Sequence, residues 1–522
     1  MSQAILPAVR PAVAQIKPVN REVELKFLVA EVGFKAAQQW PVLGLNGRRP
    51  SSRRLHTVYY DTAQGDLQRH KMLLRMRTLP RGHVMTLKWS GGFPGGLFER
   101  GEIEVTTAHE VPDPSLFGAE VAGMIEAATE GRALAAIYAT DIRRATHQIR
   151  SETSTIEIAF DAGVIVAGEI TMPVREIELE WKAGDVADLY RLGVALAEAF
   201  PVRLGMLAKS DRGVLLAAGA SPKAVRSYAM LSSDLTVDEA IGRAINSCLA
   251  QFAANWPAFE AGDAVAAVHQ MRVALRRLRA MLGLFQRAFP CPEFVSLREE
   301  ARDIATLLGE ARNLDVFMRL VREGPHAAFP DEAGFEDILQ DCEARREAAY
   351  GSVRDLLAAP ATTRFVLSAQ AFVARCGWRN SLPADALPRL TAPAQEFAAQ
   401  NLSRLHDKLL KRGKHVTALS PHQRHELRIG LKKLRYVAEL FGPLFDNPAQ
   451  VKSYTKTTAR LQDQLGTFND MNVAIGMVNQ IAGAHLRAAG IILGWCGRGT
   501  GTDQDTLKEN WRDFRKSRRF WD

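Results

Sequence analysis

Cysteine and long apolar runs are scarce in this sequence, and each scarcity excludes a class of protein. The 522 residues include five cysteines, which are odd in number and scattered, so no disulfide framework is expected. No apolar run approaches the length of a membrane span, and the N-terminal tail lacks the charged, apolar and small order of a secretory signal. We therefore expect no membrane partner and a location in the reducing cytoplasm. The cysteines are Cys248, Cys291, Cys342, Cys376 and Cys496.

Signatures of nucleic-acid binding are also missing, although the chain is basic. Its net charge is +9 and its pI is about 9.3, which suits an anionic partner. The sequence contains no helix-turn-helix, zinc-finger or RNA-recognition signature. Aromatic residues make up 7% of the chain and are too sparse along its basic segments for base stacking to add much. We therefore expect no specific nucleic-acid partner.

What the sequence does contain is charge at every second position in six short stretches of the first 210 residues. They include Glu22-Val-Glu24-Leu-Lys26, Arg75-Met-Arg77, Thr86-Leu-Lys88, Glu102-Ile-Glu104 and residues 176–180. Because successive side chains of a strand point to opposite faces, each stretch aims its charges one way and its apolar residues the other. A half-solvated sheet gives the same alternation but usually mixes the two signs, whereas these stretches are largely sorted by sign.

Separate rows of negative and positive side chains predict a ligand that needs both kinds of charge. A row of carboxylates binds a hard divalent cation through oxygen, and a row of arginines and lysines binds phosphate oxygens. The charge of a triphosphate must be neutralised from both sides if its terminal phosphoryl group is to be transferred to water. The pattern therefore predicts metal-dependent phosphate chemistry.

A glutamate-x-glutamate-x-lysine motif near the start of a chain is the signature of the CYTH family, the triphosphate tunnel metalloenzymes, and the first 210 residues resemble that family. The resemblance implies an α+β chain that begins with an antiparallel eight-stranded tunnel barrel over residues 1–218, with the active site in its lumen. Eight further segments match in order, which makes the resemblance specific. They are residues 59–62, 74–77, 85–88, 95–100, 140–144, 156–161, 176–180 and 207–210.

The resemblance also implies roles for individual side chains. The expected cofactor is Mg²⁺ or Mn²⁺, held by Glu22, Glu24, Asp161, Glu176, Glu178 and Glu180. The phosphates would be held by Lys26, Arg75, Arg77, Lys88, Arg144 and Lys209. For catalysis, we expect Lys26 to clamp the phosphates and no separate general base to be required. Glu24 and Glu178 are the candidates for a carboxylate that accepts the proton of the attacking water.

Within this family, the sequence most resembles bacterial inorganic triphosphatases that carry a second domain. It implies hydrolysis of inorganic triphosphate to pyrophosphate and phosphate. Two alternatives stay open. One is a thiamine triphosphatase, for which no aromatic or apolar shelf can be assigned, because Trp89 faces away from Lys88. The other is a catalytically idle barrel in an adaptor that binds polyphosphate.

The second half of the chain has helical periodicity and contains an internal repeat. Residues 269–279 align with residues 425–435, and residues 308–315 align with residues 465–472. Two copies of one helical unit explain both alignments. We therefore expect a linker over 219–234 and an all-α bundle over 235–522, with repeats of about 235–385 and 390–522.

Each copy of the repeat carries a cationic stripe on one helix face. A solvated basic face is the simple explanation, but like charges at i and i+4 repel and few acids interrupt the stripes, which favours an anionic partner. This half resembles the CHAD domain, a helical bundle linked to inorganic polyphosphate. The resemblance implies polyphosphate binding and a cytoplasmic location at polyphosphate granules. The stripes are His269, Arg272, Arg276 and Arg279, and His425, Arg428, Lys432 and Arg435.

Overall fold

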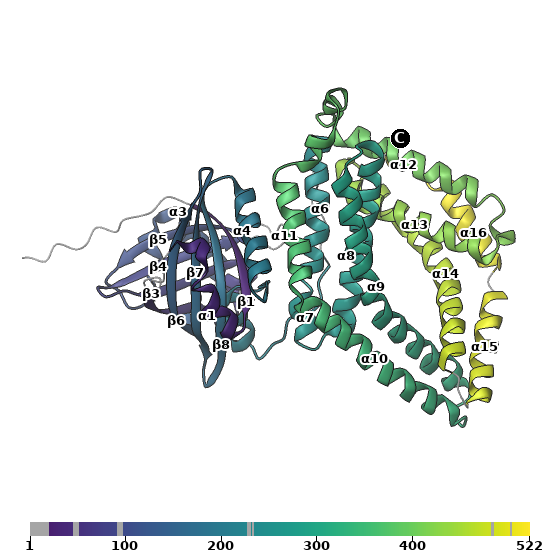
Figure 1. The fold of residues 1–522 in the computed structure, drawn as a ribbon, viewed down its shortest axis with the longest axis horizontal. Helices are drawn as coiled ribbons and strands as arrows, with labels where there is room; N and C mark the ends of the chain where they lie inside the picture. Colours follow the sequence, from purple (N-terminus) through teal and green to yellow (C-terminus); the bar gives the residue numbers. More distant parts are fainter. Residues whose placement is uncertain are drawn as a thin grey trace, which may run out of the picture. The chain divides into compact units, whose positions relative to one another are not determined.

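The computed structural model divides the chain into two compact units, Met1–Pro222 and Lys223–Asp522. Figure 1 colours the first unit purple to blue and the second teal to yellow. The first unit is built on an antiparallel sheet and the second on helices, which confirms the predicted α+β class. The structure describes residues 20–44, 52–90, 98–226, 231, 234–481, 485–501 and 504–522.

The described strands of the first unit form one antiparallel sheet that closes on itself. Its order is β5-β4-β3-β2-β6-β7-β8-β1-β9, and β1 pairs in addition with β5. Eight strands therefore make the predicted tunnel, and the short β9 continues β5 along the same edge of β1. The strands are β1 (Asn20–Val29), β2 (Ser52–Asp61), β3 (Met72–Thr78), β4 (His83–Ser90), β5 (Phe98–Thr107), β6 (Ala135–Arg150), β7 (Ser154–Ala167), β8 (Ile170–Gly184) and β9 (Val202–Leu204).

Alternation along the strands separates the core from the lumen. In β1, Leu25 and Phe27 are fully buried, whereas Glu24 and Lys26 line the lumen. The outer apolar face is covered by helices, among them α1 (Glu31–Ala37) and α4 (Val186–Ala199), which packs on β1, β7 and β8 (Figure 1). The sequence thus places its apolar residues outside the tunnel and leaves the inner face for charged groups.

The helix α5 (Lys209–Ala217) packs against β6, β7 and β8. Its Val214 and Leu216 pack on an apolar cluster that includes Tyr138 and Ile142 of β6. A side chain on Gly213 would collide with the Tyr138 ring, because a Cβ there would lie 2.2 Å from a ring carbon. This close approach brings Lys209, the first residue of α5, into the lumen.

In the second unit one arrangement of helices occurs twice. The helix α8 packs on α6 and α9, and α13 packs in the same way on α12 and α14 (Figure 1). Contacts between α8 and α13 and between α9 and α14 join the two copies. The helices are α6 (Val237–Ala253), α7 (Trp256–Glu260), α8 (Ala264–Ala288), α9 (Pro292–Val321), α10 (Gly334–Ala358), α11 (Pro360–Ala374), α12 (Ala394–Arg412), α13 (Pro421–Phe441), α14 (Pro448–Ile481), α15 (Leu486–Gly501) and α16 (Gln504–Lys516).

Across the described residues, no single helix is long and apolar enough to cross a membrane. The helices α10 and α11 meet the criteria of length and composition only as a pair, which is bent by 52°. The apolar side of α10 packs into the core, where Phe335, Ile338 and Cys342 meet residues of α14 and α15.

Replacing Phe160 with alanine should destabilise the first unit by about 3–5 kcal/mol, because the substitution leaves a cavity where a large ring is now packed. Phe160 is fully buried and meets Phe34 of α1 edge-on at 5.9 Å between ring centroids. Urea unfolding measures the loss. The control Val32→Ala, at a side chain that is 84% exposed, should change stability by less than about 0.5 kcal/mol. Equal stability of the two variants would contradict this packing.

Candidate functional site

The closed sheet surrounds a cavity of about 590 Å³. Most of the side chains predicted for the tunnel line it, including all six of the predicted phosphate ligands. Glu176 lies beside the cavity and is fully buried, and the side chain of Glu22 lies outside the described residues. The lining residues that were predicted are Glu24, Lys26, Arg75, Arg77, Lys88, Arg144, Asp161, Glu178, Glu180 and Lys209.

Acids and bases occupy opposite halves of the cavity wall. The strands β7, β8, β1 and β5 are consecutive in the closed sheet and carry the acids, and β4, β3, β2 and β6 form the other half and carry the bases. Lys26 and Lys182 are cations on the acidic half. The acidic wall consists of Glu24, Glu102, Glu104, Glu157, Asp161, Glu178 and Glu180, and the basic wall of Arg53, Arg75, Arg77, Lys88 and Arg144.

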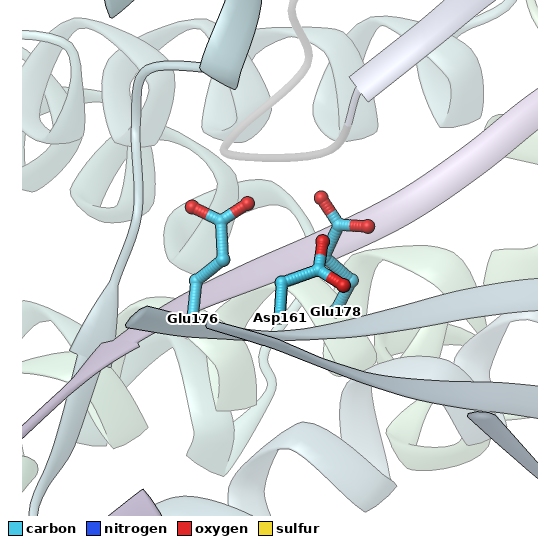
Figure 2. Close-up of side chains that lie close together, drawn as sticks. All are labelled: Asp161, Glu176 and Glu178. Carbon is cyan, nitrogen blue, oxygen red and sulfur yellow. The ribbon is translucent and has the colours of Figure 1, made fainter. Parts of the chain in front are cut away.

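Three carboxylates of the acidic half form a buried cluster. Asp161 of β7 and Glu176 of β8 are paired across the sheet, and Glu178 follows two residues later on the same face. Figure 2 shows the three side chains rising on the same side of these two strands, and oxygens from all three lie within 4.8 Å of one another. Oxygen ligands at this separation could hold a divalent ion.

Cations of the chain already engage this cluster. The ammonium group of Lys209 contacts Asp161 at 2.7 Å and Glu178 at 2.8 Å, and it also contacts Glu176. Arg144 donates two hydrogen bonds to Asp161, at 2.7 and 2.5 Å, and one to Glu178. In addition, Lys26 donates to Glu178 at 2.8 Å and Arg212 donates to Glu176. The three negative charges are therefore balanced without any added ion.

The same contacts set the protonation states. Burial alone would raise the pKa of Glu178, but Lys209, Lys26 and Arg144 lower that pKa well below its usual value. Burial would likewise lower the pKa of Lys209, and the carboxylates around it raise that pKa instead. A carboxylate with so low a pKa is a weak proton acceptor at neutral pH, which disfavours Glu178 as the general base.

A second group of carboxylates lies further along the acidic wall. Glu24 of β1, Glu180 of β8 and Glu157 of β7 are paired in register on three neighbouring strands. Lys182 contacts Glu180 at 2.5 Å and Glu157 at 4.0 Å, and Lys26 contacts Glu24. The donors are all oxygens, as Mg²⁺ or Mn²⁺ prefers, so these residues fit the predicted ion. We call Glu24, Glu157 and Glu180 the acidic row.

The basic wall carries positive charge in excess of its acidic partners. Arg75 and Lys88 share Glu102, at 3.2 and 3.3 Å. Arg77 donates to the hydroxyl of Thr57 at 3.4 Å, and within the described chain no carboxylate lies at salt-bridge distance from it. Repulsion by Arg75, together with burial, lowers the pKa of Arg77 to about 10. A bound anion would relieve this repulsion.

Sequence reasoning assigned no role to several residues of the cavity. Glu102, Glu104 and Glu157 alternate with apolar residues on their strands, which was a usable signal, but the family motif did not mark them. Tyr59 offered no charge pattern; it faces Arg75 across the sheet, and Arg75, Arg77 and Lys209 lower its pKa against the effect of burial.

In the second unit, the two cationic stripes meet at a cavity of about 420 Å³. We call it the central cavity. Two predicted stripe residues lie elsewhere: Arg279 is half-buried outside the lining, and His425 is exposed. The stripe residues that line the cavity are His269, Arg272, Arg276, Arg428, Lys432 and Arg435.

The glycines of the repeat make room for the arginines. Arg272 donates to the carbonyl oxygen of Ala305 at 3.0 Å, and a Cβ on Gly309 would lie 2.2 Å from the donating nitrogen. In the second copy, a Cβ on Gly466 would lie 3.7 Å from two guanidinium nitrogens of Arg428. The Leu-Gly steps that revealed the repeat therefore seat guanidinium groups against the next helix.

Positive charge in the central cavity is only partly balanced. Burial and the nearby Arg276 and Arg312 lower the pKa of Arg272 to about 10. Burial, then Arg428 and Arg276, lower the pKa of Lys432 to about 7. Two acids of the cavity balance part of the charge, with Glu439 at 3.5 Å from Arg435 and Asp470 at 3.8 Å from Arg428. An anion in this cavity would be stabilised by the same charges that now repel one another.

Replacing Glu178 with glutamine should destabilise the first unit by about 3–5 kcal/mol at neutral pH, because three buried cations lose a shared anion. The folded pKa of Glu178 is depressed, so its contribution is present above the unfolded value of about 4.3 and is lost as the pH falls through the folded pKa. The gap between the wild type and the variant in urea unfolding should therefore narrow below about pH 4.

The control is Glu198→Gln, a change of the same kind at an exposed position of α4, which should leave stability unchanged at both pH values. A gap for Glu178→Gln that stays constant from neutral to acid pH would contradict the charge pairing.

Comparison with known proteins agrees with both units. The CYTH domain model matches residues 20–213 and the CHAD domain model matches residues 243–479. The inorganic triphosphatase of Haemophilus influenzae is 31% identical over 199 residues, which cover 38% of this chain and 55% of that protein. An uncharacterised protein of Mycobacterium tuberculosis is 26% identical over 316 residues, covering 56% of this chain and 58% of its own. The matches thus span little more than half the length of these relatives.

Solved structures resemble each unit separately. The CHAD domain from the plant Ricinus communis is 26% identical with a TM-score of 0.46, covering 56% of this chain and 96% of its own. A second structure is that of HpAC1 from Hippeastrum, a putative adenylyl cyclase reported to have a dominant triphosphatase activity. It is 18% identical with a TM-score of 0.30, and the match covers 38% of this chain and 96% of HpAC1. By these matches, the chain carries a CYTH domain at residues 20–213 followed by a CHAD domain at residues 243–479.

Proposed function

We propose that the tunnel is a metal-dependent inorganic triphosphatase, which hydrolyses triphosphate to pyrophosphate and phosphate. The observation that carries the proposal is one cavity of about 590 Å³ with an acidic wall and a basic wall facing each other. A short, highly charged oligophosphate and its metal ion need these two surfaces at once. The 31% identity with the Haemophilus influenzae inorganic triphosphatase over 199 residues supports the same substrate.

The basic wall binds the phosphates. Arg77 is the best placed to make the first contact with the triphosphate, because binding an anion there breaks no ion pair with a described carboxylate. Arg75 and Lys88 sit on the two neighbouring strands β3 and β4 and add forked and single donors. Arg144 of β6 and Lys209 of α5 add two more cations to the cavity, and both are held in place by Asp161. The triphosphate is thereby held in one orientation before reaction.

The acidic row holds the ion. Glu24 and Glu180 face each other across β1 and β8, and Glu157 extends the row onto β7. When bound, Mg²⁺ or Mn²⁺ would neutralise charge on the triphosphate and acidify a water molecule. Asp161, Glu176 and Glu178 were expected to serve as ligands too. Each of them contacts at least two cations of the chain, so we assign them to positioning these cations.

The proton of the attacking water has one favoured acceptor. Of the two carboxylates predicted for this role, Glu178 is held ionised by three cations, whereas Glu24 contacts Lys26. Glu24 also belongs to the acidic row, next to the proposed ion, where the water would be acidified. We therefore assign proton acceptance to Glu24, with Lys26 keeping its carboxylate in place.

Thiamine triphosphate is a second candidate substrate because of Trp181. Its side chain contributes to the cavity lining and is partly exposed, and its indole nitrogen donates to the carbonyl oxygen of Gly184 at 3.2 Å. It could supply the apolar shelf that the sequence did not reveal, whereas Trp89 packs against Gly101 instead. Phosphate release from inorganic triphosphate, thiamine triphosphate and ATP, compared at equal concentration, distinguishes the candidates.

We propose in addition that the helical unit binds inorganic polyphosphate in its central cavity. Six stripe residues from α8 and α13 converge there, and burial together with mutual repulsion lowers the pKa of Arg272, Lys432 and His269. A polyanion would replace this repulsion with attraction along the whole chain of phosphates. Binding of this kind weakens as salt is added, since each contact releases counterions.

Replacing Arg77 with glutamine should lower phosphate release from inorganic triphosphate by about 10²-fold or more with Mg²⁺ present, because the reacting phosphates lose a charged donor. The fold should survive, since Arg77 has no carboxylate partner among the described residues. The matched control is Arg143→Gln, because Arg143 is exposed on the outer face of β6 and should leave turnover unchanged. Equal turnover of the two folded variants would exclude the tunnel as the active site.

Replacing Gly309 with alanine should displace Arg272 and weaken polyphosphate binding, with the slope of log affinity against log salt reduced by about one. The control Gly351→Ala also lies within a helix, α10, but a Cβ there meets nothing within 4 Å. Fluorescence titration with long-chain polyphosphate at several salt concentrations measures both variants. An unchanged slope in the Gly309→Ala protein would contradict the role of Arg272.

A further inference from the structure

A second concentration of positive charge lies in the helical unit outside the central cavity. It is centred on Lys433 of α13, and we call it the Lys433 cluster. On α8, Arg279, Gly283 and Arg287 follow one another at intervals of four residues and therefore share a helix face. The members of the cluster are Arg279, Arg287, Arg298, Arg404, Lys408 and Lys433.

The cations converge where α8 carries a glycine. A Cβ on Gly283 would lie 3.4 Å from a guanidinium nitrogen of Arg298 and 3.8 Å from the ammonium nitrogen of Lys433. Two side chains from α9 and α13 thus reach the same spot on a third helix. A Cβ at Gly283 would make ordinary van der Waals contact with both cations, so the two charged groups meet directly over this position of α8.

Nothing in the described part of the chain neutralises Lys433. No carboxylate there lies at salt-bridge distance from its ammonium group, and Arg404 donates only to the neutral side chain of Asn401. Burial, then repulsion by Arg287 and Arg404, lowers the pKa of Lys433 to about 8. Burial and Arg287 also lower the pKa of Arg404. Holding these positive charges close together therefore costs free energy, and no carboxylate of the described chain at Lys433 offsets it.

The repeat shows that this arrangement is particular to the second copy. Lys433 aligns with Arg277, which is buried and donates at 2.9 Å to the side-chain oxygen of Gln251. Gln251 in turn donates to Gln270 at 3.2 Å. In the first copy the equivalent cation donates to a neutral amide, whereas in the second copy further cations surround Lys433. If the cation at this position had the same structural role in both copies, Arg277 and Lys433 should have similar surroundings, and they do not.

We propose that the Lys433 cluster is a second anion site, separate from the central cavity, which binds phosphate groups of a long inorganic polyphosphate. The inference rests on the proposed function of the helical unit and extends it. Arg279 interacts electrostatically with both Arg276 of the central cavity and Arg298 of the cluster, so one flexible polyanion could contact the two sites in turn. Two linked contacts raise the affinity for long chains above that for short ones.

The test is the rate at which an amine-reactive reagent labels individual lysines of the full-length protein, measured by peptide mass spectrometry near pH 8. Lys433 should react readily, because its pKa of about 8 leaves much of the amine unprotonated. Long-chain polyphosphate should slow labelling of Lys433 several-fold and leave the exposed Lys452 of α14 unaffected. Protection should persist at saturating polyphosphate in a variant whose central cavity carries Arg272→Gln and Arg428→Gln.

The outcomes separate the two proposals. If polyphosphate protects Lys432 but not Lys433 in the wild-type protein, the second site is wrong and the central cavity stands. If it protects neither, polyphosphate binding by the helical unit is wrong as well. If single-stranded RNA of equal phosphate concentration protects Lys433 better than polyphosphate does, the ligand class is wrong, which overturns the proposal in its present form.

Discussion

Buried charge is stable only where opposite charge or a ligand meets it, and this constraint organises the first unit. Asp161, Glu176 and Glu178 are almost wholly buried, and Lys209 contacts all three. Lys209 is the first residue of α5, and Gly213 lets that helix approach the Tyr138 ring. The packing of α5 on the sheet therefore determines whether Lys209 can neutralise the buried carboxylates of the lumen.

The same constraint is left unsatisfied at two other places, and both point to phosphate. On the basic wall, Arg77 stands beside Arg75 without a described carboxylate partner. In the helical unit, Arg272 and Lys432 line the central cavity, where burial and neighbouring cations lower the pKa of both. Protein stability is small compared with the cost of stranding several buried charges, so such surfaces are expected where a ligand supplies the missing charge.

Much of this could be predicted from the sequence because strand and helix periods are local properties. The period of two along Glu22 to Lys26 and residues 176–180 gave the inward face, and the paired segments 269–279 and 425–435 gave the repeated helices. The partners of the inward residues could not be predicted, because neighbours across a closed sheet depend on register and closure. Glu157 joins Glu24 and Glu180 only through β8, and the positions of Arg279 and His425 outside the central cavity depend on how α8 and α13 cross.

The central claim is that metal and triphosphate meet inside the tunnel, between the acidic row and the basic wall. A crystal structure with Mn²⁺ and a non-hydrolysable triphosphate analogue tests it most directly, because anomalous scattering locates the ion independently of the phosphates. We expect the ion beside Glu24 and Glu180 and the phosphates on Arg75 and Arg77, with Lys209 still bound to Asp161. An analogue bound outside the lumen, or an ion that replaces Lys209 among Asp161, Glu176 and Glu178, would contradict it.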